Sequence, residues 1–198
     1  MTLELISALV AFAFVSSITP GPNNLMLMAS GANFGFRRTV PHMLGIGIGF
    51  TLMTVLVGLG LIRVFDAYPV THDILTVLSV AYLLWLAWKI ANAAPPEART
   101  ADAGRPMTFF QAAAFQWVNP KAWTMALTAI TVYAPDRSTG AILTVGLVFG
   151  LVNLPSVSTW TVMGQQMRRL LTNRSRLRIF NGAMALLLVA SLWPVLYP

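Results

Sequence analysis

The chain has 198 residues, of which 57% are hydrophobic and only 10% are charged, with a mean hydropathy of +0.71. Soluble domains carry roughly 25% charged residues, so this composition excludes an ordinary soluble protein and indicates an integral membrane protein. The chain contains no cysteine, which excludes disulfides, iron–sulfur ligation and thiol relays. Its net charge of +7 is concentrated in short segments between apolar stretches, which favours a fixed membrane orientation over nucleic-acid binding.

Six stretches of the chain are apolar and long enough to cross a bilayer, which takes about 20 residues. We expect an all-α membrane protein with six transmembrane helices at residues 4–28, 43–64, 73–93, 109–133, 140–163 and 178–197. The fourth stretch is the most polar, because it contains Gln111, Gln116, Asn119 and Lys121. Four spans with two interfacial helices are the alternative.

Basic residues between these stretches are distributed unequally. The first, third and fifth connections and their edges carry Arg37, Arg38, Lys89, Arg99, Arg105, Arg168, Arg169, Arg174, Arg176 and Arg178. The opposite side carries only Arg63 and Arg137. Short loops rich in Lys and Arg stay in the cytoplasm, so both termini are predicted to be periplasmic.

The stretch 94–108 is the only linker-like segment, and it divides the chain near its midpoint. We expect a single transmembrane domain, residues 1–198, in which repeat 1 (about 1–93) and repeat 2 (about 109–198) flank this cytoplasmic linker. Three spans in each half give the halves opposite orientations, so repeats of this kind are inverted repeats. The registers of the two halves agree at Pro20 with Pro120, Arg38 with Arg137, and Gly45 and Gly49 with Gly146 and Gly150.

The first predicted span is interrupted by Pro20, Gly21, Pro22, Asn23 and Asn24. The two prolines remove backbone donors, and the glycine lets the chain leave helical geometry. The half-helix that begins after this break has a partially positive N-terminus, which suits a carboxylate. The asparagines add neutral donors and acceptors, so we expect a substrate site here, with a structural kink as the alternative.

Asn119, Pro120 and Lys121 interrupt the fourth predicted span one hundred residues later. A charge deep in the bilayer costs at least ~2.5–3.5 kcal/mol, so Lys121 needs a partner or a cavity. We expect it to face the substrate carboxylate or to take part in proton coupling; snorkelling to the interface is the alternative. Asn153 in the fifth span, near Pro155 and Ser156, is predicted to line the same cavity. Paired breaks of this kind indicate a secondary transporter.

Other residues favour structural roles. Gly45 and Gly49 are small residues that let helices pack closely. His42 is expected at the cytoplasmic mouth of the second span, and His72 at the outer mouth of the third. These two separated histidines make no metal site, and no spacing suggests a catalytic nucleophile, so no enzyme activity, metal or cofactor is expected. No Asp or Glu lies in the middle of a span, where a proton-driven carrier often has one.

Several segments together resemble the lysine-exporter (LysE/RhtB) family of amino-acid exporters over essentially the whole chain: residues 19–24, 31–37, 45–49 and 115–121. The resemblance implies a six-span bacterial inner-membrane protein that exports amino acids or their derivatives and is driven by an ion gradient. Residues 81–90 look most like the cysteine/O-acetylserine exporter subgroup. Assignment to the related exporters of homoserine, threonine, leucine or arginine remains open.

The expected function is export of a small zwitterionic amino acid across the inner membrane, coupled to an ion for which the proton is the first candidate. A neutral substrate fits a polar patch without an acid better than lysine or arginine does. An uncoupled channel, a structural membrane subunit and an exporter of a basic amino acid are the alternatives. Lipid and the substrate are the expected partners, nucleic acid is not, and a homo-oligomer is left open.

Overall fold

The computed structural model describes residues 1–61, 67–68, 70–92, 105–171 and 173–193. All regular elements in these ranges are helical. In chain order they are α1 (Leu3–Ile18), α2 (Pro22–Phe34), α3 (Phe36–Leu56), the π-helical turn η1 (Val57–Leu61), α5 (Val70–Ala91), α6 (Phe109–Phe115), the 3-10 turn η3 (Gln116–Val118), α7 (Pro120–Tyr133), α8 (Thr139–Leu170) and α9 (Arg174–Ala190).

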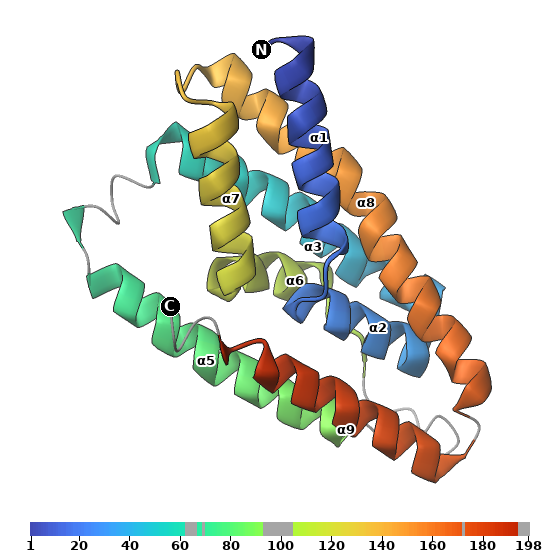
Figure 1. The fold of residues 1–198 in the computed structure, drawn as a ribbon. Helices are drawn as coiled ribbons and strands as arrows, with labels where there is room; N and C mark the ends of the chain where they lie inside the picture. Colours follow the sequence, from blue (N-terminus) through green and yellow to red (C-terminus); the bar gives the residue numbers. More distant parts are fainter. Residues whose placement is uncertain (62–66, 69, 93–104, 172, 194–198) are drawn as a thin grey trace.

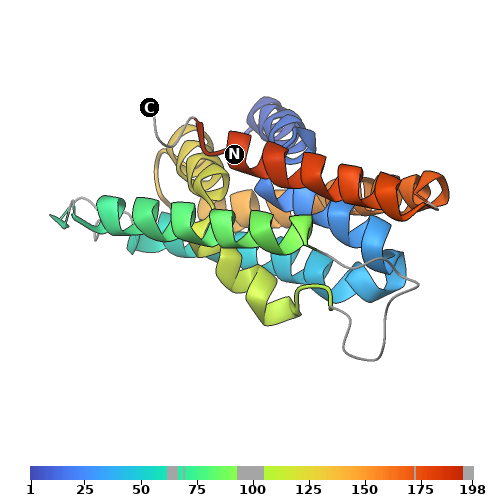
Figure 2. The same cartoon turned by 90° about the horizontal axis from the view of Figure 1, so that it is seen from below.

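The helices form a main body and a separate pair. Figure 1 shows α5 and α9 side by side along one edge, while α1, α2, α3, α6, α7 and α8 make up the body; Figure 2 shows the pair lying across it. A cluster of apolar side chains that includes Leu25, Leu83, Phe115 and Phe180 joins the pair to the body. The amide of Asn33 also donates to Asn181 Oδ1 across this contact, at 3.1 Å.

Four segments of the described chain are suited to crossing a membrane. Three helices are long and apolar enough alone, and α1 with α2 forms a fourth segment bent by 55°. The broken segment α6–η3–α7 and the 17-residue helix α9 do not meet the same measure. The membrane character is therefore confirmed, and the six-span arrangement as inverted repeats stays a prediction. Residues 94–104 of the predicted linker, Arg63 and residues 194–197 of the sixth predicted span lie outside the described residues.

Both helix breaks predicted from the sequence are present. α1 ends at Ile18 and α2 begins with Pro22, while η3 ends at Val118 and α7 begins with Pro120. Proline suits the first position of a helix because the N–H it lacks would have no intrahelical partner there. Each proline therefore starts a new half-helix at its break.

The predicted spans 4–28 and 43–64 leave residues 29–42 as a connection between them, and this prediction is wrong. α2 continues to Phe34 and α3 begins at Phe36, so only Gly35 separates them. Gly35 has a φ of 81°, in the left-handed region that favours glycine. Ser30 and Thr39 of this stretch are buried, and their hydroxyls hydrogen-bond to each other at 2.9 Å between the two helices.

Glycines set the closest helix crossings. A Cβ atom at Gly31 of α2 would collide with the carbonyl oxygen of Thr161, and one at Gly164 of α8 with the carbonyl oxygen of Met28. A Cβ atom at Gly45 or Gly49 of α3 would likewise collide with the backbone of α6, at Phe109 and Ala113 respectively. Glycine has no side chain, so helix backbones in membrane bundles approach most closely where it stands. These contacts hold α2, α3, α6 and α8 around both breaks.

Candidate functional site

The two helix breaks meet at a small polar cavity of about 30 Å³ in the main body. Its lining residues are Ser16, Ser17, Gly21, Asn23, Asn24, Ile46, Phe50, Asn119, Lys121, Ala122, Met125 and Asn153. Six of the nine residues predicted for the substrate site are among them. The other three, Pro20, Pro22 and Pro120, lie at the breaks and outside this lining.

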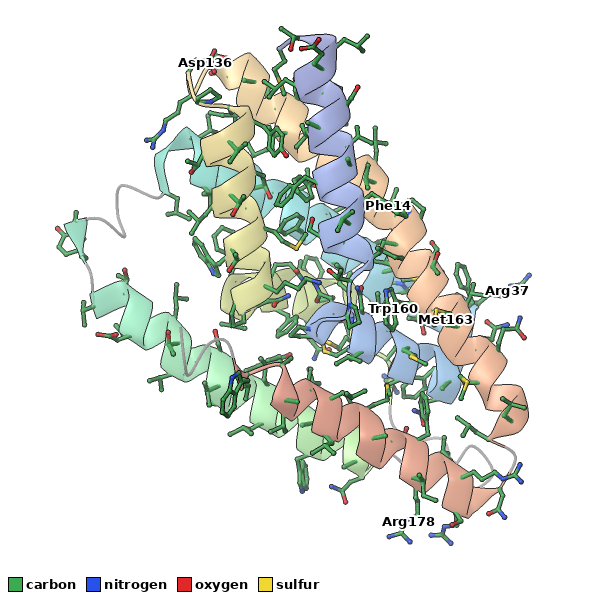
Figure 3. All side chains as sticks on the ribbon, in the orientation of Figure 1. Phe14, Arg37, Asp136, Trp160, Met163 and Arg178 are labelled. Carbon is green, nitrogen blue, oxygen red and sulfur yellow. The ribbon has the colours of Figure 1, made fainter. Side chains whose placement is uncertain are left out.

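The C-terminal end of α1 is closed by side chains from other segments. The last carbonyls of a helix have no intrahelical donors, and buried ones need partners. Ser17 O accepts from Asn24 Nδ2 at 2.7 Å and from Ser156 Oγ at 2.8 Å. Ile18 O accepts from the indole nitrogen of Trp160 at 3.0 Å, and Figure 3 shows Trp160 on α8. The break in the first predicted span is therefore held open by specific donors.

Lys121 completes this set of donors from the first turn of α7. Its Nζ donates to Thr19 O at 2.7 Å, to Thr19 Oγ1 at 2.9 Å and to Pro20 O at 3.3 Å. The C-terminal end of a helix is partially negative, so the ammonium group lies where α1 favours a cation. The Lys121 chain also covers Gly21, where a Cβ atom would come within 2.6 Å of its Cδ.

An amide pair joins the two breaks directly. Asn23 Nδ2 donates to Gln116 Oε1 at 2.8 Å, and Gln116 Nε2 donates back to Asn23 Oδ1 at 3.2 Å. Gln116 is fully buried, and its Nε2 also donates to Ala112 O at 2.9 Å. From the sequence, Gln116 is predicted only as a polar residue of the fourth span, without a role at the breaks. Its position three residues before the Asn119 break was the available signal.

Two acceptor atoms near the cavity have no hydrogen-bond partner. Asn119 Oδ1 and Asn153 Oδ1 are both buried without a donor, although both side chains line the cavity. An unpaired buried polar atom costs about 1–3 kcal/mol, so such atoms call for an explanation. Amide oxygens accept from an ammonium group, whereas the N-terminal turns of α2 and α7 offer backbone donors to a carboxylate. The arrangement therefore suits both ends of a zwitterion.

The cavity is too small to hold an amino acid in this structure. A space of about 30 Å³ holds on the order of one or two water molecules, which is less than any amino acid occupies. The Lys121 contacts to α1 and the Asn23–Gln116 pair lie across it. An amino acid would therefore fit between the breaks only in a wider arrangement of these segments.

Sequence reasoning missed three features of this region. Ser17 was not singled out, although it accepts hydrogen bonds at the end of α1 and lines the cavity. Trp160 was not connected with the first break. His42 was expected at a membrane mouth, but it is buried with an exposed fraction of 1%.

We predict that cysteines introduced by Asn23→Cys and Asn119→Cys are joined by a short bifunctional thiol linker. Both positions line one cavity although they are far apart in the sequence, and the chain has no cysteine that would give background. A direct disulfide needs Cα atoms within about 7 Å, and the linker relaxes that limit. Mass spectrometry of membrane samples measures the linkage.

The matched control pairs Asn23→Cys with Leu187→Cys, because Leu187 is 47% exposed on α9. This control should give no linkage. A substrate that enters between the breaks should change the yield of the Asn23–Asn119 pair. Absence of linkage, together with failure of both single cysteines to react with small water-soluble thiol reagents, would mean that the breaks are only kinks.

Comparison with known proteins finds relatives along the whole length of the chain. A family model for the LysE type translocator matches residues 14–191. The chain is 30% identical over 193 residues to the "Cysteine/O-acetylserine efflux protein" of Escherichia coli (strain K12), covering 96% of each chain. The protein of the same name from Shigella sonnei (strain Ss046) matches with the same identity and coverage. No solved structure gives a significant match.

Proposed function

Because the chain belongs to the family of LysE type translocators, and is therefore a multi-pass inner-membrane amino-acid efflux transporter and not an enzyme, we propose that it exports a small neutral amino acid. Cysteine and O-acetylserine are the first candidates, since the relatives that match the whole chain are efflux proteins for these two compounds. Homoserine, threonine and leucine are the next candidates of similar chemistry.

The observation that carries this proposal is the pair of unpaired oxygens, Asn119 Oδ1 and Asn153 Oδ1, beside two half-helix N-termini. The substrate ammonium donates to the oxygens. The substrate carboxylate accepts from the backbone donors of α2 or α7, or from Lys121 after this side chain leaves Thr19 and Pro20. The cavity lining contains one cation and no acid, which favours a neutral zwitterion over lysine or arginine.

Transport proceeds by alternating access in this proposal. Two inverted three-helix repeats, in a six-span arrangement, rock against each other around the cavity and expose it to one side at a time. The small volume of the cavity, the Lys121 contacts and the Asn23–Gln116 pair support a state between the two openings. An inward ion gradient, with the proton as coupling ion, drives the substrate outward.

Efflux from proteoliposomes loaded with single radiolabelled amino acids tests the proposal. The panel contains cysteine kept reduced, O-acetylserine, homoserine, threonine, leucine, lysine and arginine. Saturable efflux of a neutral member, accelerated by a proton gradient, supports it. Non-saturable efflux that ignores the gradient would indicate a channel, and efflux of only lysine or arginine would identify an exporter of basic amino acids.

We predict periplasmic termini. The charge asymmetry of the connections places the first, third and fifth of them in the cytoplasm, and an even number of spans returns the chain to the side where it began. Alkaline phosphatase fused after Pro198 should therefore be active, and a cytoplasm-dependent reporter at the same site should not. A cytoplasmic signal from an intact fusion would overturn the six-span proposal.

A further inference from the structure

His42 on α3 is a buried histidine without a hydrogen-bond partner. Its exposed fraction is 1%, and neither Nδ1 nor Nε2 has a donor or acceptor within reach. An unpaired buried polar atom costs stability, because the hydrogen bonds it makes to water in the unfolded chain are not replaced. The arrangement therefore destabilises the fold, and a role outside folding explains why a titratable ring is placed there.

Along α3, His42 lies between residues that line two different cavities. Arg38, His42, Ile46 and Phe50 follow one another at four-residue spacing, so they are neighbours along one side of α3. Ile46 and Phe50 line the cavity at the helix breaks. Arg38 lines an open cleft of about 900 Å³ at the corner of α2 and α3 beside α8.

Buried hydroxyl groups lie on α3 and α2 between the residues of the cleft and the turn of α3 that carries His42. The lining residues of the cleft are Phe34, Gly35, Phe36, Arg37, Arg38, Val162, Gln165 and Gln166, and Figure 3 shows Arg37 pointing outward there. Thr39 donates to Gly35 O at 2.9 Å and pairs with Ser30 at 2.9 Å. Thr39 precedes His42 by three residues, which is neighbour spacing on a helix. The Ser30–Thr39 hydroxyl pair thus lies within one helical turn of His42, toward the end of α3 that borders the cleft.

Few charged groups surround this histidine. α3 packs against α2, α6, α7, α8, η1 and η3. The titratable and charged side chains on these elements and on the rest of α3 are Arg37 and Arg38 of α3, Lys121 and Tyr133 of α7, and Arg168 and Arg169 in the last turn of α8. None of these elements carries a carboxylate that could bind the proton in place of His42.

We propose that His42 is the residue that binds and releases the coupling proton. This inference rests on the proposed function of gradient-driven export, and it assigns the proton step to a residue outside the predicted substrate site. It also provides a proton-binding group although no Asp or Glu lies in the middle of the predicted spans, because an imidazole that water reaches takes up and loses a proton near neutral pH.

The proton step is a simple addition to the ring. When the cavity opens toward the periplasm, a proton from that side binds the unprotonated ring nitrogen of neutral His42 and forms an imidazolium. After the repeats have rocked, the imidazolium releases the same proton through the cleft beside Arg37 and Arg38, on the predicted cytoplasmic side. The neutral ring is restored, and one proton has crossed inward against the outward path of the substrate.

Proteoliposomes containing His42→Gln test this assignment with radiolabelled reduced cysteine as the probe. Glutamine remains polar but does not titrate at neutral pH. We expect export driven by an inward proton gradient to fall at least tenfold, together with the proton uptake that a pH-sensitive dye reports. Exchange of labelled for unlabelled cysteine without a gradient should stay within twofold of the wild type. His72→Gln, at the only other histidine, should keep both activities.

A second variant separates coupling from folding. In His42→Leu the unpaired polar atoms are removed, so thermal unfolding in detergent should occur at or above the wild-type temperature while gradient-driven export is lost. If His42→Gln or His42→Leu retains gradient-driven export with proton uptake, the assignment is wrong although the export function stands. If the variants lose exchange together with driven export, His42 serves the structure or the substrate and the assignment is also wrong. If the wild-type protein itself neither exchanges nor exports any amino acid of the panel, the proposed function fails first.

Discussion

Replacing Lys121 by methionine lowers export at least about tenfold while the amount of protein in the membrane stays near the wild-type level. Methionine keeps most of the side-chain length but loses the ammonium that bonds to Thr19 and Pro20 and that is proposed to meet the substrate carboxylate. A tenfold loss corresponds to ~1.4 kcal/mol of binding or transition-state stabilisation. Efflux from proteoliposomes, normalised to reconstituted protein, measures it.

Lys89→Met is the matched control, because Lys89 is the only other lysine. Its Nζ lies 5.1 Å from the ring centre of Trp85 at the end of α5, away from the cavity lining. This variant should export normally. Lys121→Arg should export poorly, since a planar guanidinium does not replace a compact ammonium and the space above Gly21 is already filled. Wild-type export by Lys121→Met would show that the lysine serves only the end of α1 and not the substrate.

Gly164→Ala should strongly destabilise the protein. The added Cβ atom would collide with the carbonyl oxygen of Met28, which is part of the α2 backbone and cannot rotate away. Overpacking of this kind costs about 1–3 kcal/mol and occasionally more. Because α2 carries Asn23 and Asn24, the shift of α2 also disturbs the cavity. Thermal unfolding of the purified protein in detergent should show a lower melting temperature than the wild type.

Gly182→Ala, by contrast, should not destabilise the protein. Nothing lies within 4 Å of a Cβ atom at Gly182 of α9, and alanine is a better helix former than glycine by roughly 0.5–1 kcal/mol. This variant should melt at or above the wild-type temperature. Equal melting temperatures for Gly164→Ala and the wild type would contradict the close crossing of α2 and α8.

The membrane class, the family and the positions of both helix breaks can be read from the sequence alone. These features follow from local properties: apolar length decides what enters a bilayer. A proline directly after Gly21 or Asn119 takes the first position of a new half-helix, because the N–H it lacks has no intrahelical partner there. The resemblance of segments 19–24 and 115–121 to the lysine-exporter family is confirmed by the family match and by the relatives. Pairing between the registers of the halves stays a prediction.

Only the tertiary structure decided which groups meet. Lys121 bonds to the end of α1, Asn23 pairs with Gln116, and Trp160 donates to Ile18. Each contact joins segments about a hundred residues apart or more, and residue type alone does not select one of many possible partners. His42 became buried without a hydrogen-bond partner, which its residue type did not indicate. The stretch from 29 to 42 became helical for a reason related to the contacts above. Neighbouring helices supply partners such as Ser30 for Thr39, so a polar segment that reads as a loop is stable inside the protein.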